Sequence, residues 1–334
     1  MDSNLLFLLA IIFVAVTFDY INGFHDTANA IATVVSTRVL SPLAAVAMAA
    51  FFNFIGAFTG TQVAKTVGAD IVDPSNSNQT IVICSLLAAI IWNLITWWLG
   101  LPSSSSHALI GGLIGAGISG NGFRLDVIKG DGVLKVLIGL IGSPIFGFLI
   151  GYVVMVLLNW LLIKATPHFV NTWFRRLQLF SAAFMAFSHG GNDAQKTMGI
   201  ITLAILTYEG RPGSTFQVPI WVILLAASAM AAGTASGGWR IIRTMGSKIV
   251  DLKPVNGFAA ETSAATVIET ASRLGFPVST THVISTAIVG VGASHRLSAV
   301  RWSTVGNIVK AWVFTIPVCI MLGIVIESVF SFFF

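Results

Sequence analysis

Several long stretches of almost uninterrupted apolar sequence constrain the fold of this chain more than any other feature. A helix needs roughly 20 residues to cross a hydrocarbon core of about 30 Å. Stretches of that length are 42–64, 80–101, 133–163, 218–237 and 302–333. They are continuously apolar, whereas the strands of a membrane β-barrel alternate in short segments. The sequence therefore predicts an all-α membrane protein that crosses the bilayer several times.

The composition and the distribution of charge support the same interpretation. Hydrophobic residues make up 55% of the 334 positions and charged residues only 9%, against roughly 25% charged in soluble domains. The formal charge is +5, but Lys and Arg lie mainly in connectors between apolar stretches, which indicates membrane topology and not a nucleic-acid surface. The basic connectors 164–176 and 238–253 are expected in the cytoplasm, and 60–78 on the opposite side.

Two motifs recur in the same order along the chain. Gly23 to Asn29 aligns with Gly190 to Lys196, and Pro102 to His107 aligns with Pro277 to His282. Repeats in membrane transporters often have inverted topology and enclose a midplane site, about which the halves rock in alternating access. A duplicated bundle without transport is the alternative. We predict three parts: a first repeat over 1–163, a short polar connector over 164–177 and a second repeat over 178–334.

Asp26 and Asp193 occupy matching positions in the two repeats. Each follows a short apolar segment, 5–18 or 178–187, and is followed by more apolar sequence, so we expect both carboxylates at membrane depth. A carboxylate there costs about 2.5–3.5 kcal/mol and should face a cavity, a partner or an ion. The neighbouring glycines predict a helix broken beside each aspartate, with freed backbone groups that can bind ions. A buried aspartate that only caps a half-helix is the alternative.

The second motif places hydroxyl side chains at the start of a short apolar run in each repeat. The runs 108–119 and 283–293 are too short to span a bilayer, so we predict two re-entrant hairpins. Hydroxyls and the first backbone amides of a helix can bind an anion without a fixed positive charge. Ordinary N-capping of two helices is the alternative. The candidate anion ligands are Ser104, Ser105, Ser106, Ser279, Thr280 and Thr281.

Two basic side chains lie within the aspartate motifs. Lys196 stands where the first repeat has Asn29. It could neutralise Asp193, contact an anion, or extend to an interface as a snorkelling lysine. His25 lies beside Asp26 and can take up a proton near neutral pH.

Further titratable residues fall in apolar surroundings. Of the two glutamates in the stretch 255–272, Glu261 is a stronger candidate than Glu269 because it begins the segment near the second hairpin. The remaining histidines of the motifs are interpreted as satisfied cavity residues and not as carriers of chemistry: His107, His189 and His282.

Together these motifs resemble those of the inorganic phosphate transporter (PiT) family, which also includes some sulfate permeases. The match covers almost the whole chain, through Asn22 to Ala30, Pro102 to His107, Ser188 to Lys196 and Pro277 to His282. The resemblance implies two inverted repeats whose centre binds phosphate. It carries over the two aspartates, the Ser and Thr hydroxyls, Asn29 and Asn192, and Glu261 also matches a family position.

Two departures from the sodium-coupled pattern bear on the coupling ion. Sodium-coupled members usually carry Gly-Ala-Asn-Asp where this chain has Gly23 to Asp26, and many have Asn at the position of Lys196. Both changes bring a positive charge to positions where Na⁺ would seek neutral oxygen ligands. The chain is in this respect similar to the bacterial low-affinity branch, which couples to protons and takes phosphate as a neutral complex with a divalent metal.

The resemblance thus implies proton symport of phosphate in a bacterial plasma membrane, with Mg²⁺ or Ca²⁺ as co-transported cargo. The ion-coupling residues would be His25, Asp26, Asp193 and Glu261. The substrate-binding residues would be Asn29, Ser104, Ser105, Ser106, Asn192, Lys196, Ser279, Thr280 and Thr281.

Alternatives stay open inside and outside this family. Inside it they are sodium coupling and sulfate transport, and outside it an intramembrane hydrolase or an anion channel. A hydrolase needs one nucleophile oriented by one base, whereas these hydroxyls occur in duplicated tracts, which favours a symmetric binding cavity. We therefore expect no enzyme activity, no cofactor and no resident metal site. The sequence leaves a homodimer open.

Overall fold

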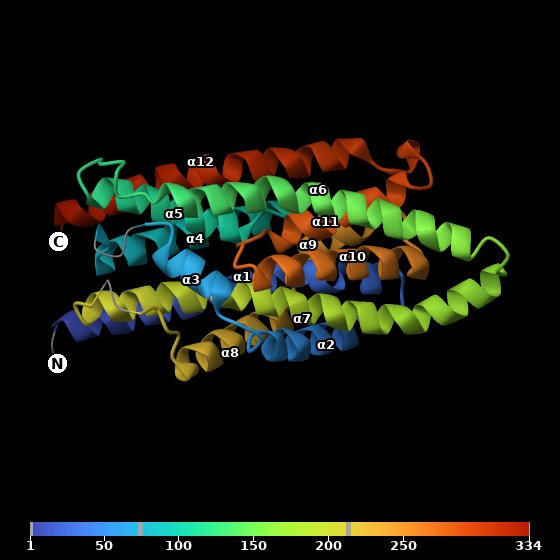
Figure 1. Cartoon of the computed structure of the whole chain (residues 1–334), viewed down its shortest axis with the longest axis horizontal. Helices are drawn as coiled ribbons and strands as arrows, with labels where there is room; N and C mark the ends of the chain where they lie inside the picture. The colour runs from blue at the N-terminus through green and yellow to red at the C-terminus, as the bar shows by residue number, and fades with distance from the viewer. Residues whose placement is uncertain (1–2, 73–75, 212–214, 334) are drawn as a thin grey trace.

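The structure, a computed structural model, describes residues 3–72, 76–211 and 215–333. Figure 1 shows its long helices lying lengthwise beside one another. The predicted first repeat contains α1 (Ser3–Ser36), α2 (Pro42–Gly56), α3 (Gln62–Ala69), α4 (Gln79–Leu99), α5 (Ser105–Gly120) and α6 (Gly130–Leu161). The remainder contains α7 (Pro167–Tyr208), α8 (Ile220–Ser236), α9 (Trp239–Ser247), α10 (Pro254–Arg273), α11 (Thr280–Ala293) and α12 (Trp302–Phe333). Residues 1–2 and 334, the outer ends of the predicted repeats, lie outside the described residues.

Four of the described helices, α1, α4, α6 and α12, are long and apolar enough to cross a membrane. Helices α8 and α9 would add a fifth span if this pair, bent by 71°, crosses as one unit. Large apolar side chains remain exposed along these helices, among them Phe13, Trp160 and Phe314. Such a surface suits lipid and not water. The prediction of an all-α, multi-pass membrane protein is therefore confirmed.

The prediction that helices break beside the two aspartates is wrong. Helices α1 and α7 continue through Asp26 and Asp193 without interruption. The glycines next to them serve close helix contact: a Cβ on Gly23 would lie 2.5 Å from the carbonyl oxygen of Met230 in α8. A Cβ on Gly190 would likewise lie 2.2 Å from the carbonyl oxygen of Asn53 in α2. The interruptions occur instead between α2 and α3 and between α8 and α9.

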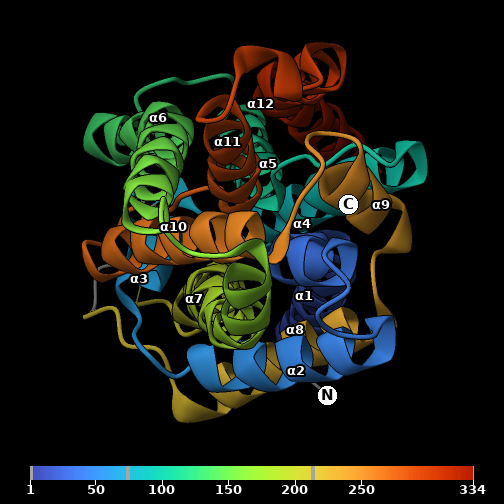
Figure 2. The ribbon, with the colours of Figure 1, turned by 90° about the vertical axis from the view of Figure 1, so that its right-hand side faces the viewer.

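The helices pack in matched pairs that combine the two halves of the chain. Helix α1 packs against α8 and α9, and α7 packs against α2 and α3. Helix α5 packs against α12, and α11 against α6. Figure 2 shows α1 and α7 side by side near the centre. They run in opposite directions: Thr37, just after α1, hydrogen-bonds Gln178 in the first part of α7, whereas Asp26, earlier in α1, lies close to Asp193, later in α7.

At the position of each predicted hairpin, a longer helix is followed by a tight turn and a shorter helix. Helix α4 turns at Gly100 into α5, and α10 turns at Gly275 into α11, with φ of +65° and +74° at the two glycines. Glycine suits both positions because other residues rarely adopt a positive φ. Helix α7 begins at Pro167, so most of the predicted polar connector 164–177 is its first turns.

Candidate functional site

Asp26 of α1 is buried and its carboxylate is held by the neighbouring histidine. The Nδ1 atom of His25 lies 2.6 Å from Oδ1 of Asp26. The other ring nitrogen lies 3.0 Å from the hydroxyl of Thr96 in α4 and 3.4 Å from that of Ser103 in the turn before α5. His25 therefore connects the first aspartate to the first hairpin.

Asp193 of α7 is also buried, but its partners differ. The ammonium of Lys196 lies 2.5 Å from Oδ1 of Asp193, and Nε2 of His189 lies 3.5 Å from Oδ2. The side chain of Lys196 is only 1% exposed. Lys196 therefore neutralises Asp193 inside the protein, and the snorkelling interpretation is wrong.

The two aspartates, far apart in the sequence, come together across the interface of α1 and α7. Oxygen atoms of Asp26 and Asp193 and a ring nitrogen of His189 all lie within 4.8 Å of one another. Two carboxylates so close repel each other unless a positive group or a proton compensates. His25, His189 and Lys196 are the groups in place to provide that compensation.

The second hairpin reaches this centre directly. The amide of Asn29 donates to the hydroxyls of Thr280 (3.2 Å) and Thr281 (3.0 Å). The hydroxyl of Thr280 lies 3.4 Å from Oδ2 of Asp193, to which it donates. A residue of the first aspartate motif, two hairpin residues and the second aspartate thus form one hydrogen-bonded cluster.

The six candidate hydroxyls divide into different local roles. Ser104 and Ser279 cap α5 and α11 by accepting from the backbone N–H groups of His107 and His282. The hydroxyl of Ser106 donates to the carbonyl oxygen of Val278, which joins the two hairpins. The hydroxyl of Ser105 has no hydrogen-bond partner among the described residues. Capping therefore accounts for one hydroxyl in each hairpin and leaves the others for a ligand or for contacts within the site.

Asn192 joins this cluster at its edge, whereas Glu261 lies outside it. The side-chain amide of Asn192 donates to Oδ1 of Asp193 at 3.2 Å, and its oxygen accepts from the hydroxyl of Ser272 in α10 at 2.7 Å. The carboxylate of Glu261 accepts from Thr33 of α1 at 2.5 Å, from Gln178 of α7 at 3.0 Å, and from Ser181. Thr33 follows Asp26 by seven residues, or about 10 Å along a helix. Glu261 thus belongs to a second buried polar cluster, further along the same interface.

Sequence reasoning missed two features of the buried interior. Asp19 of α1 is fully buried and neither of its oxygens has a hydrogen-bond partner among the described residues. Its spacing of seven residues from Asp26 places both on one face of a helix, a signal present in the sequence. The interpretation of His107 and His282 as satisfied cavity residues is wrong. None of their four ring nitrogens has a hydrogen-bond partner among the described residues, and the two ring centroids lie 4.9 Å apart.

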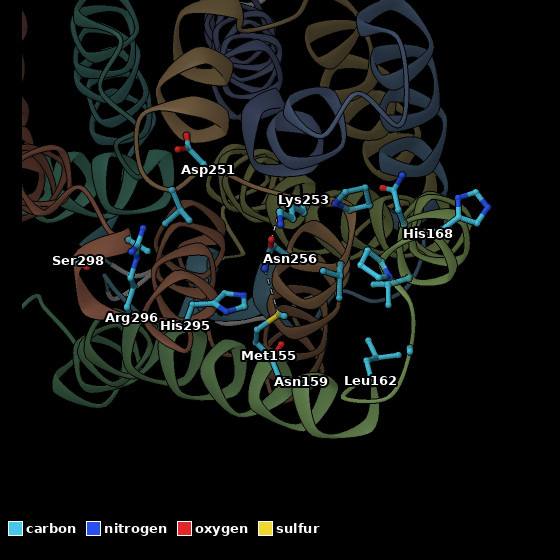
Figure 3. A pocket seen from close by; sticks show the side chains of 18 of the residues that line it. Met155, Asn159, Leu162, His168, Asp251, Lys253, Asn256, His295, Arg296 and Ser298 are labelled. Atoms are coloured by element: carbon cyan, nitrogen blue, oxygen red, sulfur yellow. Dashed lines mark hydrogen bonds between the residues drawn. The ribbon is translucent and has the colours of Figure 1, made fainter.

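A large open basin lies at one end of the molecule, away from the aspartates. It has a volume of about 1310 Å³ and is lined by residues from the turn between α6 and α7, the start of α10 and the loop between α11 and α12. Figure 3 shows its basic and titratable side chains, which include His168, Lys253, His295 and Arg296. Asp26 and Asp193 are 3% and 0% exposed. The central site is therefore closed to solvent in this conformation.

Comparisons with known proteins identify the family of this chain. The model of the phosphate transporter family matches residues 22–323. A probable low-affinity inorganic phosphate transporter of Rhizobium meliloti (strain 1021) is 50% identical over 326 residues, covering 97% of both chains. A protein of the same description from Bacillus subtilis (strain 168) is 46% identical over 325 residues, again covering 97% of both.

One solved structure shares the fold. It is described as the sodium-dependent phosphate transporter, with a TM-score of 0.89, 24% sequence identity and coverage of 98% of this chain and 100% of that chain. The family consists of transporters and not enzymes. On the extent of the family match and the identity to its bacterial relatives, the chain belongs to the phosphate transporter family.

Proposed function

We propose that this protein imports inorganic phosphate by proton symport, through alternating access of two inverted repeats. The observation that carries the proposal is the meeting of two buried aspartates, each held by a basic side chain, with hydroxyls of the second hairpin. The matched packing of α1 with α8 and of α7 with α2 supports two related halves. The opposite directions of α1 and α7 support their inversion.

The phosphate site is formed by the starts of α5 and α11 together with the motif residues. Free backbone amides at a helix start and nearby hydroxyls suit phosphate oxygens. Ser105, whose buried hydroxyl has no hydrogen-bond partner among the described residues, is the side chain most available to donate to the ligand. The two close relatives described as probable low-affinity phosphate transporters support phosphate over sulfate. The other members of this site are Asn29, Ser104, Ser106, Asn192, Lys196, Ser279, Thr280 and Thr281.

Protons drive the transport in this proposal. Lys196 places a permanent positive charge 2.5 Å from Asp193, where Na⁺ would be repelled in a medium of low dielectric. His25, in contact with Asp26, can hold or relay a proton. The sodium dependence in the description of the solved relative belongs to that protein, which shares the fold at 24% identity. Glu261 is a further candidate for proton transfer at the second polar cluster.

Phosphate crosses as a neutral complex with Mg²⁺ or Ca²⁺, which avoids moving a bare dianion into low dielectric. The basin at the end of α6 faces the cytoplasm in this proposal, because basic residues gather there. The membrane is a bacterial plasma membrane, and the protein can function as a homodimer.

Counterflow of labelled phosphate in proteoliposomes tests the substrate. Vesicles loaded with unlabelled phosphate should accumulate external label transiently, and excess internal or external sulfate should not replace phosphate. Equal exchange with sulfate would identify a sulfate permease. Flux that only dissipates a gradient, without counterflow, would indicate an anion channel and contradict the proposal.

A further inference from the structure

Asp19 is the one described buried acid whose carboxylate has no hydrogen-bond partner within the described residues. The other four have partners: Asp26 has His25, Asp193 has Lys196, Glu261 has Thr33, Gln178 and Ser181, and Glu327 has Ser331. Asp19 is 0% exposed, so bulk solvent does not reach it in this conformation. An ionised carboxylate in such a place is costly unless it is paired. The position calls for a ligand that removes or balances its charge.

The charged groups that face Asp19 come from α7. They are Asp193 and Lys196, and Lys196 is already paired with Asp193 at 2.5 Å. Helices α2, α4 and α8, which also pack against α1, carry no charged side chain. On α9, Arg240 lies over Trp98 and Arg243 is exposed. On α10, Glu261 binds Thr33, and Glu269 and Arg273 pair with each other. Helix α11 offers only His282. Asp19 thus has no counter-ion of its own.

The neighbouring polar atoms are also incompletely bonded. Asn22 and Thr197 are the polar side chains that interact with Asp19, yet the carbonyl oxygen of Asn22 and the hydroxyl of Thr197 have no hydrogen-bond partner among the described residues. A proton on Asp19 would turn one of its oxygens into a donor that could bond to either of them. A proton would neutralise the carboxylate and provide the missing hydrogen bonds. Na⁺ would instead require a ring of oxygen ligands.

The place of Asp19 along α1 suits a proton that enters from outside. Helix α1 starts near the end where both termini lie, opposite the turn between α6 and α7 that borders the basic basin (Figure 1). Asp19 precedes Asp26 by seven residues, about 10 Å of helix. It therefore lies between that end and the aspartate pair, on the external side if the basin is cytoplasmic.

We propose that Asp19 binds the coupling proton, and this rests on the proposed function of proton-driven phosphate import. The proton is taken from the external side and released to the cytoplasm, and no other bond is made or broken. When Asp19 is protonated, Lys196 pairs with Asp193 alone, and one negative charge beside the aspartate pair is removed. Ionised Asp19 competes with Asp193 for Lys196, so loss of the proton disfavours the arrangement seen here. Proton binding and phosphate binding thereby become coupled.

The variant Asp19→Asn tests this proposal, because asparagine resembles the protonated acid permanently. Proteoliposomes containing an internal pH dye are given an inward pH gradient and labelled phosphate. We expect uphill accumulation to fall at least tenfold and phosphate-induced internal acidification to disappear, while phosphate counterflow, which needs no net proton movement, persists. The matched control Glu327→Gln changes a buried acid on α12 that has its own partner, and it should keep proton-driven accumulation.

Other outcomes would overturn the proposal. If the Asp19→Asn variant still accumulates phosphate with internal acidification, the proton binds elsewhere. Loss of counterflow together with accumulation would place Asp19 in phosphate binding or in folding instead.

If Asp19→Asn is not recovered as folded protein, Asp19→Glu replaces it: a pH profile of uptake shifted from the wild type supports the proposal, and an unchanged profile rejects it. Wild-type uptake that follows sodium instead of protons would refute the proposed function itself, and this proposal with it.

Discussion

The aspartate motif of α1 and that of α7 occupy equivalent places in the fold but carry different partners. Asp26 is paired with the imidazole of His25. Asp193 is paired with the ammonium of Lys196 and with the imidazole of His189. The backbone setting is alike, since each helix continues through its motif and packs a glycine closely against α8 or α2. The two halves thus share a scaffold and differ in charge.

In the proposed mechanism, that difference gives the two halves separate tasks. Lys196 would supply beside Asp193 the positive charge that a bound cation would otherwise provide. His25 would pass a proton to or from the site beside Asp26. Matched substitutions that change a charge should therefore lower the stability of the protein by different amounts in the two halves. Matched substitutions that change only packing should lower it by similar amounts.

The largest difference should follow from Asp193→Asn compared with Asp26→Asn. Asp193→Asn leaves the buried ammonium of Lys196 without its partner, which typically costs about 3–5 kcal/mol. Asp26→Asn leaves a histidine that can stay neutral, so the expected loss is roughly 0.5–1.5 kcal/mol, the net value of one hydrogen bond. Thermal unfolding in detergent measures the stability, and phosphate uptake should be lost in both.

A double substitution separates stability from transport. Asp193→Asn with Lys196→Met removes both charges and should recover most of the lost stability, because no unpaired ion remains. Uptake should stay absent. Equal destabilisation by the two single asparagine variants would contradict the charge difference between the halves.

Substitutions that disturb only packing should, in contrast, lower stability by similar amounts in both halves. An added Cβ at Gly23 would lie 2.5 Å from a carbonyl oxygen of α8, and one at Gly190 2.2 Å from a carbonyl oxygen of α2. Overpacking of this kind costs about 1–3 kcal/mol, so Gly23→Ala and Gly190→Ala should lower the melting temperature alike. Gly306→Ala is the control, since no atom lies within 4 Å of its added Cβ. It should be neutral or stabilising.

The smallest difference concerns the hairpin hydroxyls. Thr280 donates to Asp193 and accepts from Asn29, whereas Ser105 has no partner among the described residues. Without phosphate, Thr280→Ala should therefore cost roughly 0.5–1.5 kcal/mol of stability and Ser105→Ala almost none. Ser105→Ala should instead weaken phosphate binding measured by calorimetry, by roughly tenfold or more. Unchanged affinity would mean that Ser105 does not contact phosphate.

Composition predicted the helical membrane fold, and repetition singled out Asp26 and Asp193, which the structure brings together in the buried interior. Composition and repetition failed where backbone geometry depends on distant partners. The glycines at 23 and 190 indicated helix breaks, because the sequence alone does not show that α8 and α2 approach them so closely. The isolation of Asp19 was equally hidden, since a missing partner can be recognised only after every neighbouring helix is in place.

The central claim is that protons, and not sodium ions, drive phosphate across this protein. Its most direct test is the initial rate of phosphate uptake into proteoliposomes under an inward pH gradient without sodium, compared with an inward sodium gradient at equal pH. Magnesium or calcium is present in parallel series, to show whether the metal complex is the transported form. Uptake should follow the pH gradient and be unaffected by sodium. Uptake that follows sodium and ignores the pH gradient would contradict it, and His25 and Lys196 would then need another explanation.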